Sequence, residues 1–312
     1  MTSVSETTET DLFSHPSVPT LEVPGIARLP RAEWQVIDWL GAWDFWGLHL
    51  AALVGVLLLP PSAGDLVLCA AAFYFRILGV SLAYHRYFAH RTFRTSRAFQ
   101  LVLAFWAQTS VQKGVLWWAG HHRNHHRYAD TPDDVHSPVR RGFLWSHMGW
   151  ILAPRYSDTP VEVIRDMAAY PELRWLDRHK HVPSFAFGLA MFAIDGISGF
   201  VWGFLVSTVL LWHGTFSINS LAHVYGKRRY PTTDTSRNNL WLALLTGGEG
   251  WHNNHHFFCS SAQLGFRWWE FDPTYTLIRA LEKLGVVWDV RRPPRHVIEG
   301  RPANVAPADA RA

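Results

Sequence analysis

Residues 65–84 read DLVLCAAAFYFRILGVSLAY, and this apolar stretch runs directly into the cluster His85-Arg-Tyr-Phe-Ala-His90. A helix needs about 20 apolar residues to cross the hydrocarbon core of a bilayer. A second apolar block, residues 44–60, comes just before it and is separated from it by a short turn that contains Pro and Gly. The two blocks predict a pair of membrane-spanning helices with histidine side chains at one membrane surface.

The same pattern returns at residues 184–199 and 201–222, which are again two apolar blocks joined by a short turn. The turns at 60–64 and 195–200 contain no Lys or Arg, whereas the segment 85–184 contains 14 of them. Basic loops favour the cytoplasmic side of a membrane, so the long segments and both termini are expected there. We predict an all-α integral membrane protein with four transmembrane helices in two hairpins and a cytoplasmic helical cap that holds a di-metal site. Buried helices of a soluble protein are the less favoured alternative.

Composition supports a membrane protein and excludes several other classes. Tryptophan occurs 17 times, and charged residues make up only 17% of the chain, against about 25% in soluble domains. The net charge of +4 is spread between the apolar blocks, which argues against a nucleic-acid partner. Two distant cysteines, Cys69 and Cys259, exclude a disulfide framework and a cysteine zinc site. Residues 1–35 are expected to be a disordered tail and residues 291–312 a loose tail, around a membrane domain of residues 36–290.

The first histidine cluster contains two candidate ligands, His85 and His90, at the inner end of the second span. On an α-helix, five residues turn the chain about 140° beyond a full revolution, so these two imidazoles cannot share one face. Either the helix ends between them or they serve different metals.

Two further clusters share one spacing. HHRNHH places His122, His125 and His126 at positions i, i+3 and i+4, which puts three imidazoles on one helical face. GEGWHNNHH repeats this spacing at residues 252–256. Together with the first cluster, these motifs predict a metal site at the cytoplasmic surface.

A fourth element closes the last span, where Asn219 and His223 lie one helical turn apart. Eight or nine neutral imidazoles without a thiolate suit iron, zinc or copper, and their number implies two metals because a structural zinc needs only four ligands. The HExxH motif of zinc proteases is absent, and only Glu249-x-x-His252 has the ExxH form of soluble carboxylate di-iron sites. Two iron ions with only nitrogen ligands, placed beside a bilayer, are suited to activating O2 for the cleavage of an unactivated C–H bond.

The histidines outside these motifs fall into two groups. Those inside or beside the spans are expected to be packing or interfacial residues: His49, His179, His181 and His213. Three others are candidates for groups that support the ligands: His121, His136 and His147.

At these motifs the chain resembles the stearoyl-CoA desaturase family of membrane fatty acyl desaturases. HRYFAH, HHRNHH, SINSLAHVYG and GEGWHNNHH occur in the family's order between about residues 40 and 275. The resemblance implies nine metal-binding histidines and an asparagine that contacts one metal through water: His85, His90, His122, His125, His126, His223, His252, His255, His256 and Asn219. It also implies two iron ions that activate O2, remove hydrogen from two adjacent methylenes and leave a cis double bond, commonly near carbon 9 of a saturated C16–C18 chain.

Two departures from the family pattern concern residues beside the ligands. Asn254 stands where the family has Tyr in the third cluster, which is not a ligand position. Gly120 and His121 stand where the family's acyl-CoA enzymes carry an Arg-Asp pair that helps to hold coenzyme A. The acyl carrier is therefore left open between coenzyme A, a membrane lipid and a carrier protein.

An acyl chain requires a dry, bent tunnel, whose floor we expect on the second span, two to three turns above His85. The residues expected there are Cys69, Ala72, Phe73 and Arg76. A guanidinium in mid-span costs about 2.5–3.5 kcal/mol on insertion scales, so Arg76 is expected to pair within the helix bundle or to cap the tunnel.

Electrons are expected to come from a separate protein, because the sequence has no haem motif, flavin fingerprint or cysteine cluster. The resemblance implies a ferredoxin or cytochrome b5-type donor with an NAD(P)H reductase, and a multi-pass protein of a bacterial cell membrane. Lys227, Arg228 and Arg229 could steer an acidic donor, although the positive-inside rule explains them as well. The alternatives are a fatty acyl hydroxylase or acetylenase with the same motifs, and a non-catalytic zinc-binding membrane protein.

Overall fold

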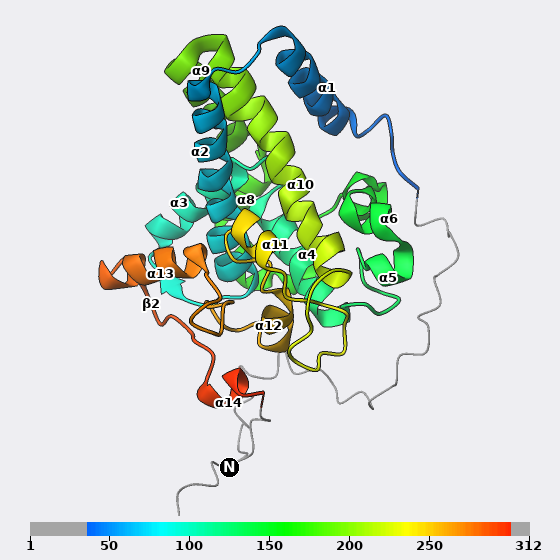
Figure 1. Ribbon diagram of the computed structural model, residues 1–312, viewed down its shortest axis with the longest axis vertical. Helices are drawn as coiled ribbons and strands as arrows, with labels where there is room; N and C mark the ends of the chain where they lie inside the picture. Colours follow the sequence, from blue (N-terminus) through cyan, green and yellow to red (C-terminus); the bar gives the residue numbers. More distant parts are fainter. Residues whose placement is uncertain (1–35, 301–312) are drawn as a thin grey trace, which may run out of the picture.

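The computed structural model describes residues 36–300, so the predicted N-terminal tail of residues 1–35 lies outside the described residues. This part of the chain is almost entirely helical. Its one ladder pairs β1 (Arg94–Thr95) with β2 (Val287–Trp288) in antiparallel register. Figure 1 shows long helices in one half of the molecule and short helices in the other. The predicted all-helical class is therefore confirmed.

The long half is built from helices that match the four predicted apolar blocks. They are α1 (Trp43–Leu58), α2 (Ala63–Gly79) with its continuation η3 (Val80–Ala89), α9 (His181–Ser198), and η7 (Gly199–Val206) followed by α10 (Ser207–Ser220) and η8 (Leu221–His223). At Asp195 and Gly196 the backbone leaves helical geometry, and Gly196 adopts a φ of +55° that suits glycine. The chain folds back there, which brings Gly188 against Phe204.

Two of these stretches, residues 63–89 and 181–223, are long and apolar enough to cross a membrane, and residues 43–58 form a shorter apolar helix. The second stretch contains the turn of a hairpin, as predicted. α1 packs chiefly against η7 and stands apart from α2 in Figure 1. The number of bilayer crossings stays a prediction.

The other half forms a cap of short helices at one end of the long ones (Figure 1). Its elements are α3 (Arg97–Gln108), α4 (Val115–Tyr128), α5 (Pro138–Arg141), α6 (Phe143–His147), η4 (Gly149–Leu152), η5 (Pro154–Tyr156), η6 (Val161–Val163), α7 (Arg165–Ala168), α8 (Pro171–Arg178), α11 (Leu240–Leu245), α12 (His252–Phe257), α13 (Pro273–Lys283) and α14 (Arg295–Ile298).

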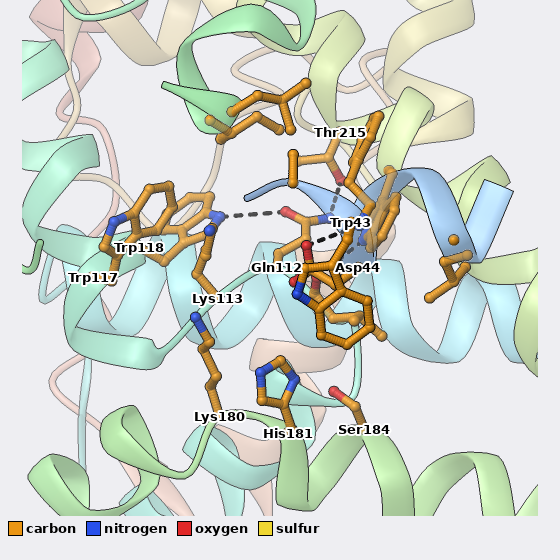
Figure 2. A pocket seen from close by; sticks show the side chains of 18 of the residues that line it. Trp43, Asp44, Gln112, Lys113, Trp117, Trp118, Lys180, His181, Ser184 and Thr215 are labelled. Carbon is orange, nitrogen blue, oxygen red and sulfur yellow. Dashed lines mark hydrogen bonds between the residues drawn. The ribbon is translucent and has the colours of Figure 1, made fainter. Parts of the chain in front are cut away.

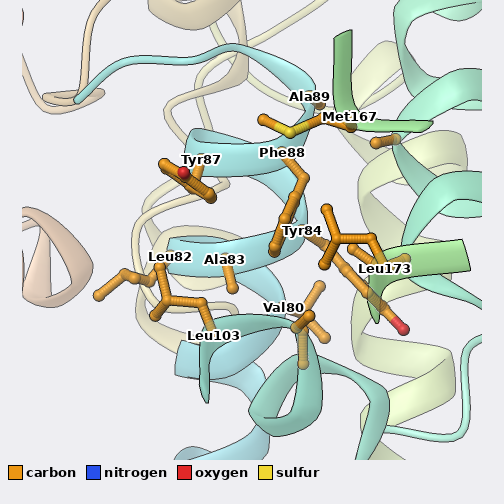
Figure 3. Close-up of a cluster of buried hydrophobic side chains, with 14 of the residues drawn as sticks. Val80, Leu82, Ala83, Tyr84, Tyr87, Phe88, Ala89, Leu103, Met167 and Leu173 are labelled. Carbon is orange, nitrogen blue, oxygen red and sulfur yellow. The ribbon is translucent and has the colours of Figure 1, made fainter. Parts of the chain in front are cut away.

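The segment η3 lies at the centre of the largest buried cluster (Figure 3). Every residue of η3 is buried, and Leu82 and Phe88 are fully so. Leu103 of α3 and Leu173 of α8 pack against this segment from the cap. Burying one such side chain contributes about 1.5–3 kcal/mol, so the cluster holds the backbone of η3 firmly in place.

The outer ends of the long helices are joined by polar contacts. Ser62 and Asp65 form a capping box at the start of α2. Ser198 Oγ donates to Asp65 Oδ1 at 2.5 Å, which ties the start of α2 to the end of α9.

Residues 291–300 belong to the packed domain. Arg291 N–H donates to the Thr92 carbonyl at 2.8 Å, and Tyr230 Oη donates to the Ile298 carbonyl at 2.8 Å. Val297 is buried. The packed domain therefore extends to residue 300, beyond the predicted boundary at residue 290, because α14 covers Tyr230.

Candidate metal centre

His85 lies on the π-helix η3, and His90 is the residue that caps its C-terminal end. The His90 N–H donates to the His85 carbonyl at 3.1 Å, which is the i→i+5 hydrogen bond of this helix type. The wider turn brings residue i+5 close to residue i, so the two rings lie 4.8 Å apart between centroids. Of the two alternatives predicted from α-helical geometry, the structure shows the first: the helix ends at Ala89, between the two histidines, and both imidazoles join one group.

The nine predicted ligands gather into two groups of buried or nearly buried imidazoles, whose ligand atoms lie within 4.8 Å of one another in each group. The first group contains His85, His90, His122, His126 and His255. The second group contains His125, His223, His252 and His256. Together they draw on η3, α4, η8 and α12, so segments far apart in the sequence meet at one place.

The spacing predicted that the three histidines of each HxxHH motif share one helical face. In the structure, each motif instead divides its histidines between the two groups. In α4, His122 and His126 join the first group, while His125 turns to the second. α12 does the reverse, since His255 joins the first group and the other two histidines of its cluster join the second. Each helix therefore lies across both groups and holds them at a fixed separation.

Distances between imidazole nitrogens within each group are short. The Nε2–Nε2 distances are 2.9 Å for His85–His255, 2.9 Å for His126–His255, 3.0 Å for His90–His122 and 3.1 Å for His223–His252. Two nitrogens bound at about 2.1 Å to one metal and 90° apart would be about 3 Å from each other. The imidazoles therefore have the spacing of ligands that share a metal ion.

Three buried nitrogens of the second group have no hydrogen-bond partner among the described residues, His252 Nδ1 and two Nε2 atoms. The two Nε2 atoms belong to His125 and His256. In both rings the other nitrogen faces a carboxylate, with His125 Nδ1 at 3.0 Å from Asp134 and His256 Nδ1 at 2.9 Å from Asp234. A buried polar atom without a partner costs about 1–3 kcal/mol. A metal ion bound by these Nε2 atoms would remove that cost, so the residues present fit a metal.

Two more ligands are held by carboxylates. His223 Nδ1 lies 3.3 Å from Asp130, and His85 Nδ1 lies 2.6 Å from Glu249. Such contacts fix the tautomer and orientation of an imidazole and raise its basicity as a ligand. Sequence reasoning missed the three aspartates and noted Glu249 only for its spacing. The available signal was the position of Asp130, only a few residues after the second histidine cluster.

The electrostatics of the site favour metal binding. Burial lowers the pKa of His122, His126 and His255 well below the usual range, and neighbouring imidazoles act in the same direction. Burial would raise the pKa of Asp134, but His125 outweighs it and lowers that pKa to about 2. These three imidazoles are thus neutral, which is the form that binds a metal, and Asp134 is ionised.

The remaining candidates occupy different positions. Asn219 lies one turn before His223 on α10, and its contact with a metal through water stays a prediction. His136 stacks on His125 at 4.1 Å between ring centroids, as a supporting residue would. His147 instead pairs with His213 at 2.9 Å, away from the two groups.

A cavity of about 1140 Å³ extends from the histidine groups toward α1 and α9 (Figure 2). His122 and Asn219 line its inner end. A polar bridge crosses it, because Trp118 Nε1 donates to Gln112 Oε1 at 3.4 Å and Gln112 Nε2 donates to Thr215 Oγ1 at 3.0 Å. Most of its other lining is apolar, which suits an acyl chain.

The four residues predicted for the tunnel floor do not line this cavity: Cys69, Ala72, Phe73 and Arg76. They are buried against η7 and α10. Arg76 donates to Thr208 Oγ1 at 2.6 Å and to Ser207 Oγ at 2.5 Å, so it pairs within the bundle. Their role in a tunnel stays a prediction.

Residues 61–292 match the family model of the fatty acid desaturases. The chain belongs to this family. It is 35% identical over 260 residues to the sn-1 stearoyl-lipid 9-desaturase of Anabaena variabilis, covering 82% of this chain and 94% of that protein. It is 35% identical over 261 residues to the hex-5-enoyl-[acyl-carrier protein] acetylenase of Moorena producens, covering 78% and 81%. It is 33% identical over 268 residues to an acyl-CoA 5-desaturase of Anemone leveillei, covering 82% and 83%. The resemblance seen in the histidine motifs is confirmed, and the desaturase is an oxidoreductase.

Proposed function

We propose that this desaturase introduces a cis double bond near carbon 9 of a saturated C16–C18 acyl chain. The saturated chain R–CH2–CH2–R′ reacts with O2, two electrons and two protons. The products are the unsaturated chain R–CH=CH–R′ and two water molecules. The observation that carries this proposal is the largely apolar cavity of about 1140 Å³ whose inner end reaches His122 and Asn219. A chain threaded into it would bring a pair of methylenes beside both histidine groups.

Two iron ions are the metals that this donor set suits, since it offers nitrogen ligands and no thiolate. The five imidazoles of the first group would hold one iron, and the four of the second group would hold the other, with Asn219 contributing through water. When bound, the iron pair supplies the oxygen activation that C–H cleavage requires.

The protein's own side chains hold and shield the reacting region. Asp130, Asp134, Asp234 and Glu249 fix the orientation of four ligand imidazoles. Trp118, which the Gln112–Thr215 pair holds through a hydrogen bond, stacks on His122 at 4.8 Å between ring centroids. The cavity wall at Trp118 and the imidazole of His122 are thereby fixed relative to each other. An acyl chain in the cavity would therefore be held in a defined position beside the metal.

The topology that goes with this function is a multi-pass protein of a bacterial cell membrane with four crossings and the metal centre on the cytoplasmic side. A ferredoxin or cytochrome b5-type protein would deliver electrons there. Arg229 already pairs with Glu270, and Arg228 donates to the Asp234 carbonyl at 2.8 Å. All three side chains considered for steering are exposed, but within residues 36–300 Lys227 is the one whose charged group has no hydrogen-bond or ion-pair partner, so its ammonium remains available to an acidic donor.

Lipid profiling tests the proposal. The wild-type chain and His125→Ala are expressed in a host that lacks a desaturase, and mass spectrometry locates any new double bond. We expect a cis-9 monounsaturated chain from the wild type and none from His125→Ala. The matched control is His179→Ala, which removes an exposed histidine outside both groups and should leave the product unchanged.

Other products would replace the proposal. A hydroxylated chain would indicate the hydroxylase alternative. A triple bond would indicate the acetylenase alternative, for which the acetylenase of Moorena producens is a precedent. A protein that contains zinc, consumes no O2 and changes no lipid would indicate the non-catalytic alternative.

A further inference from the structure

The wall of the cavity is incomplete between α1 and α9. Five apolar side chains line the cavity and are nevertheless between 50% and 74% exposed: Trp43, Phe185, Leu189, Phe192 and Ile197. On the opposite wall, Phe204, Trp212 and Phe216 are buried. The cavity therefore opens sideways through an apolar face, which in the proposed topology faces the hydrocarbon of the bilayer.

Charged side chains gather at the end of this opening, where α1 and α9 both begin. Lys113, Lys180 and Asp44 line the cavity there, and Figure 2 shows Lys180 pointing toward Lys113. Within residues 36–300 neither lysine forms an ion pair with a carboxylate. Burial lowers the pKa of Lys113, and the charge of Lys180 adds to this effect. Asp44 acts in the opposite direction on this pKa. These two cations and one anion thus face the same space and carry a net positive charge between them.

The N-terminus of α9 adds to the positive potential at this end. No side chain caps it. Val182 N–H donates to the His179 carbonyl at 3.0 Å and Pro183 has no N–H, so this end contributes through the helix dipole rather than through a set of free N–H groups. The segment that carries Lys113 is strained, because Val111 and Lys113 have φ of +58° and +67° without being glycine. This strained backbone places Lys113 at the edge of the cavity.

The region corresponding to the coenzyme A contacts is covered. A Cβ on Gly120 would lie 2.8 Å from Pro160 Cγ, so no larger residue fits beneath this loop without a shift. His121 is buried, and its Nε2 lies 3.1 Å from the Asp158 carbonyl. Residues 158–160 therefore close the surface on which a coenzyme A moiety would have to rest.

We propose that the acyl chain enters the cavity sideways from the bilayer, between α1 and α9, while it is still esterified to a glycerophospholipid. The phosphate lies beside Lys113 and Lys180, and the acyl chain passes the exposed apolar residues of α9 toward the polar bridge and the histidine groups. This inference rests on the proposed function and names its substrate class. The charge and polarity of the site match such a lipid along its length. A cationic site for the phosphate lies at the membrane surface, and an apolar slot for the acyl chain extends from it.

Photo-crosslinking tests the route without any metal. Metal-depleted protein is placed in nanodiscs that contain phosphatidylglycerol with a diazirine in the middle of one stearoyl chain, and mass spectrometry maps the labelled residues. We expect label on cavity residues such as Thr215. Lys113→Gln and Lys180→Gln should each lower this label about fivefold, the effect of about one surface cation on lipid attraction. Lys283→Gln, an exposed lysine at the end of α13, is the control and should not change it.

Steric variants test the opening itself. Leu189→Trp should narrow it and reduce label on Thr215, whereas Leu50→Trp, on the outward face of α1, should not. Label confined to outward residues such as Leu57, or equal label from a galactolipid that has no phosphate, would overturn the proposal. So would efficient competition by stearoyl-CoA that is insensitive to both lysine substitutions.

A conversion assay separates this inference from the function on which it rests. The metal-loaded enzyme is given stearoyl-phosphatidylglycerol vesicles or stearoyl-CoA, with a reduced ferredoxin. Conversion of stearoyl-CoA without any phospholipid crosslink overturns the lipid route and leaves the desaturase function in place. Crosslinks without conversion of either substrate support the lipid site and overturn the proposed function.

Discussion

The two histidine groups differ in number and in support. The first group has five imidazoles, and one of them, His85, faces a carboxylate. The second group has four imidazoles, and three of them face a carboxylate. A carboxylate behind an imidazole makes it a stronger donor, so the second group compensates for one missing ligand with more negative charge around it. Fewer protein ligands would also leave more room for water or oxygen at a metal held by the second group.

The largest expected effect comes from removing one ligand from each group. His255→Ala and His252→Ala should each lower desaturation by more than about 100-fold, because a lost ligand exceeds the 10–100-fold effect typical of its supporting residues. Metal analysis of the purified proteins should show a loss at the affected site first. If both variants kept two irons per chain, the assignment of these histidines as ligands would be wrong.

Removing the supporting carboxylates should separate the two groups. Asp134→Asn and Asp234→Asn should each weaken metal binding at the second group by about 10–100-fold, and Glu249→Gln should do so at the first. The rate of iron loss to a chelator measures this effect. The comparison predicts that Asp134→Asn and Asp234→Asn together release the second iron while the first remains bound. Simultaneous loss of both irons would show that the groups are not independent.

Acid should destabilise the metal-free protein, chiefly through the first group. Burial lowers the pKa of His90, His122, His126 and His255 in the folded state. A histidine whose pKa is lowered in the folded state takes up a proton more readily in the unfolded state, where its pKa is about 6.5. The fold therefore has its full stability above that pH and loses stability as the pH falls below it. His223 acts in the opposite direction, because Asp130 outweighs burial and raises its pKa.

The measurement is the unfolding temperature of metal-free protein between pH 7.5 and pH 5.5. We expect it to fall over this range, because the free energy of unfolding falls by about 1.4 kcal/mol per pH unit for each histidine that titrates only in the unfolded state. In His122→Gln the fall should be smaller than in His223→Gln. An unfolding temperature that is independent of pH would contradict the burial of neutral imidazoles.

The smallest expected effect concerns Asn254, which lies between ligands of both groups on α12. It is fully buried, donates to Glu270 Oε2 at 2.9 Å and accepts from Asn238 Nδ2 at 2.6 Å. Asn254→Ala should cost about 1–3 kcal/mol of folding stability, because it leaves the Asn238 amide N–H without its partner and removes one of the hydrogen bonds to Glu270, which Arg229 and Arg267 still contact. Chemical denaturation measures it, and chelator release should quicken equally for both irons. A selective effect on one iron would show that α12 does not hold the two groups as a unit.

Several features could be predicted from local sequence because they depend on chain neighbours. The apolar blocks predicted the long helices, and the spacing of Asn219 and His223 predicted their placement on one turn. The four carboxylate partners could not be predicted, since Asp234 meets His256 and Glu249 meets His85 only through folding. The lateral opening of the cavity could not be predicted from the sequence either, because it depends on how α1 is placed relative to α9.

The sequence by itself determined the candidate ligands and the family's chemistry, because residue type decides which atoms can bind a metal and which segments can enter a bilayer. Only the tertiary structure decided how those ligands are shared. His85 and His90 join one group because η3 is a π-helix, and a pattern of residue types does not distinguish that helix from an α-helix when burial holds it in place. The HxxHH motifs divide between two groups because α4 and α12 lie across both, and their crossing is set by the packing around them.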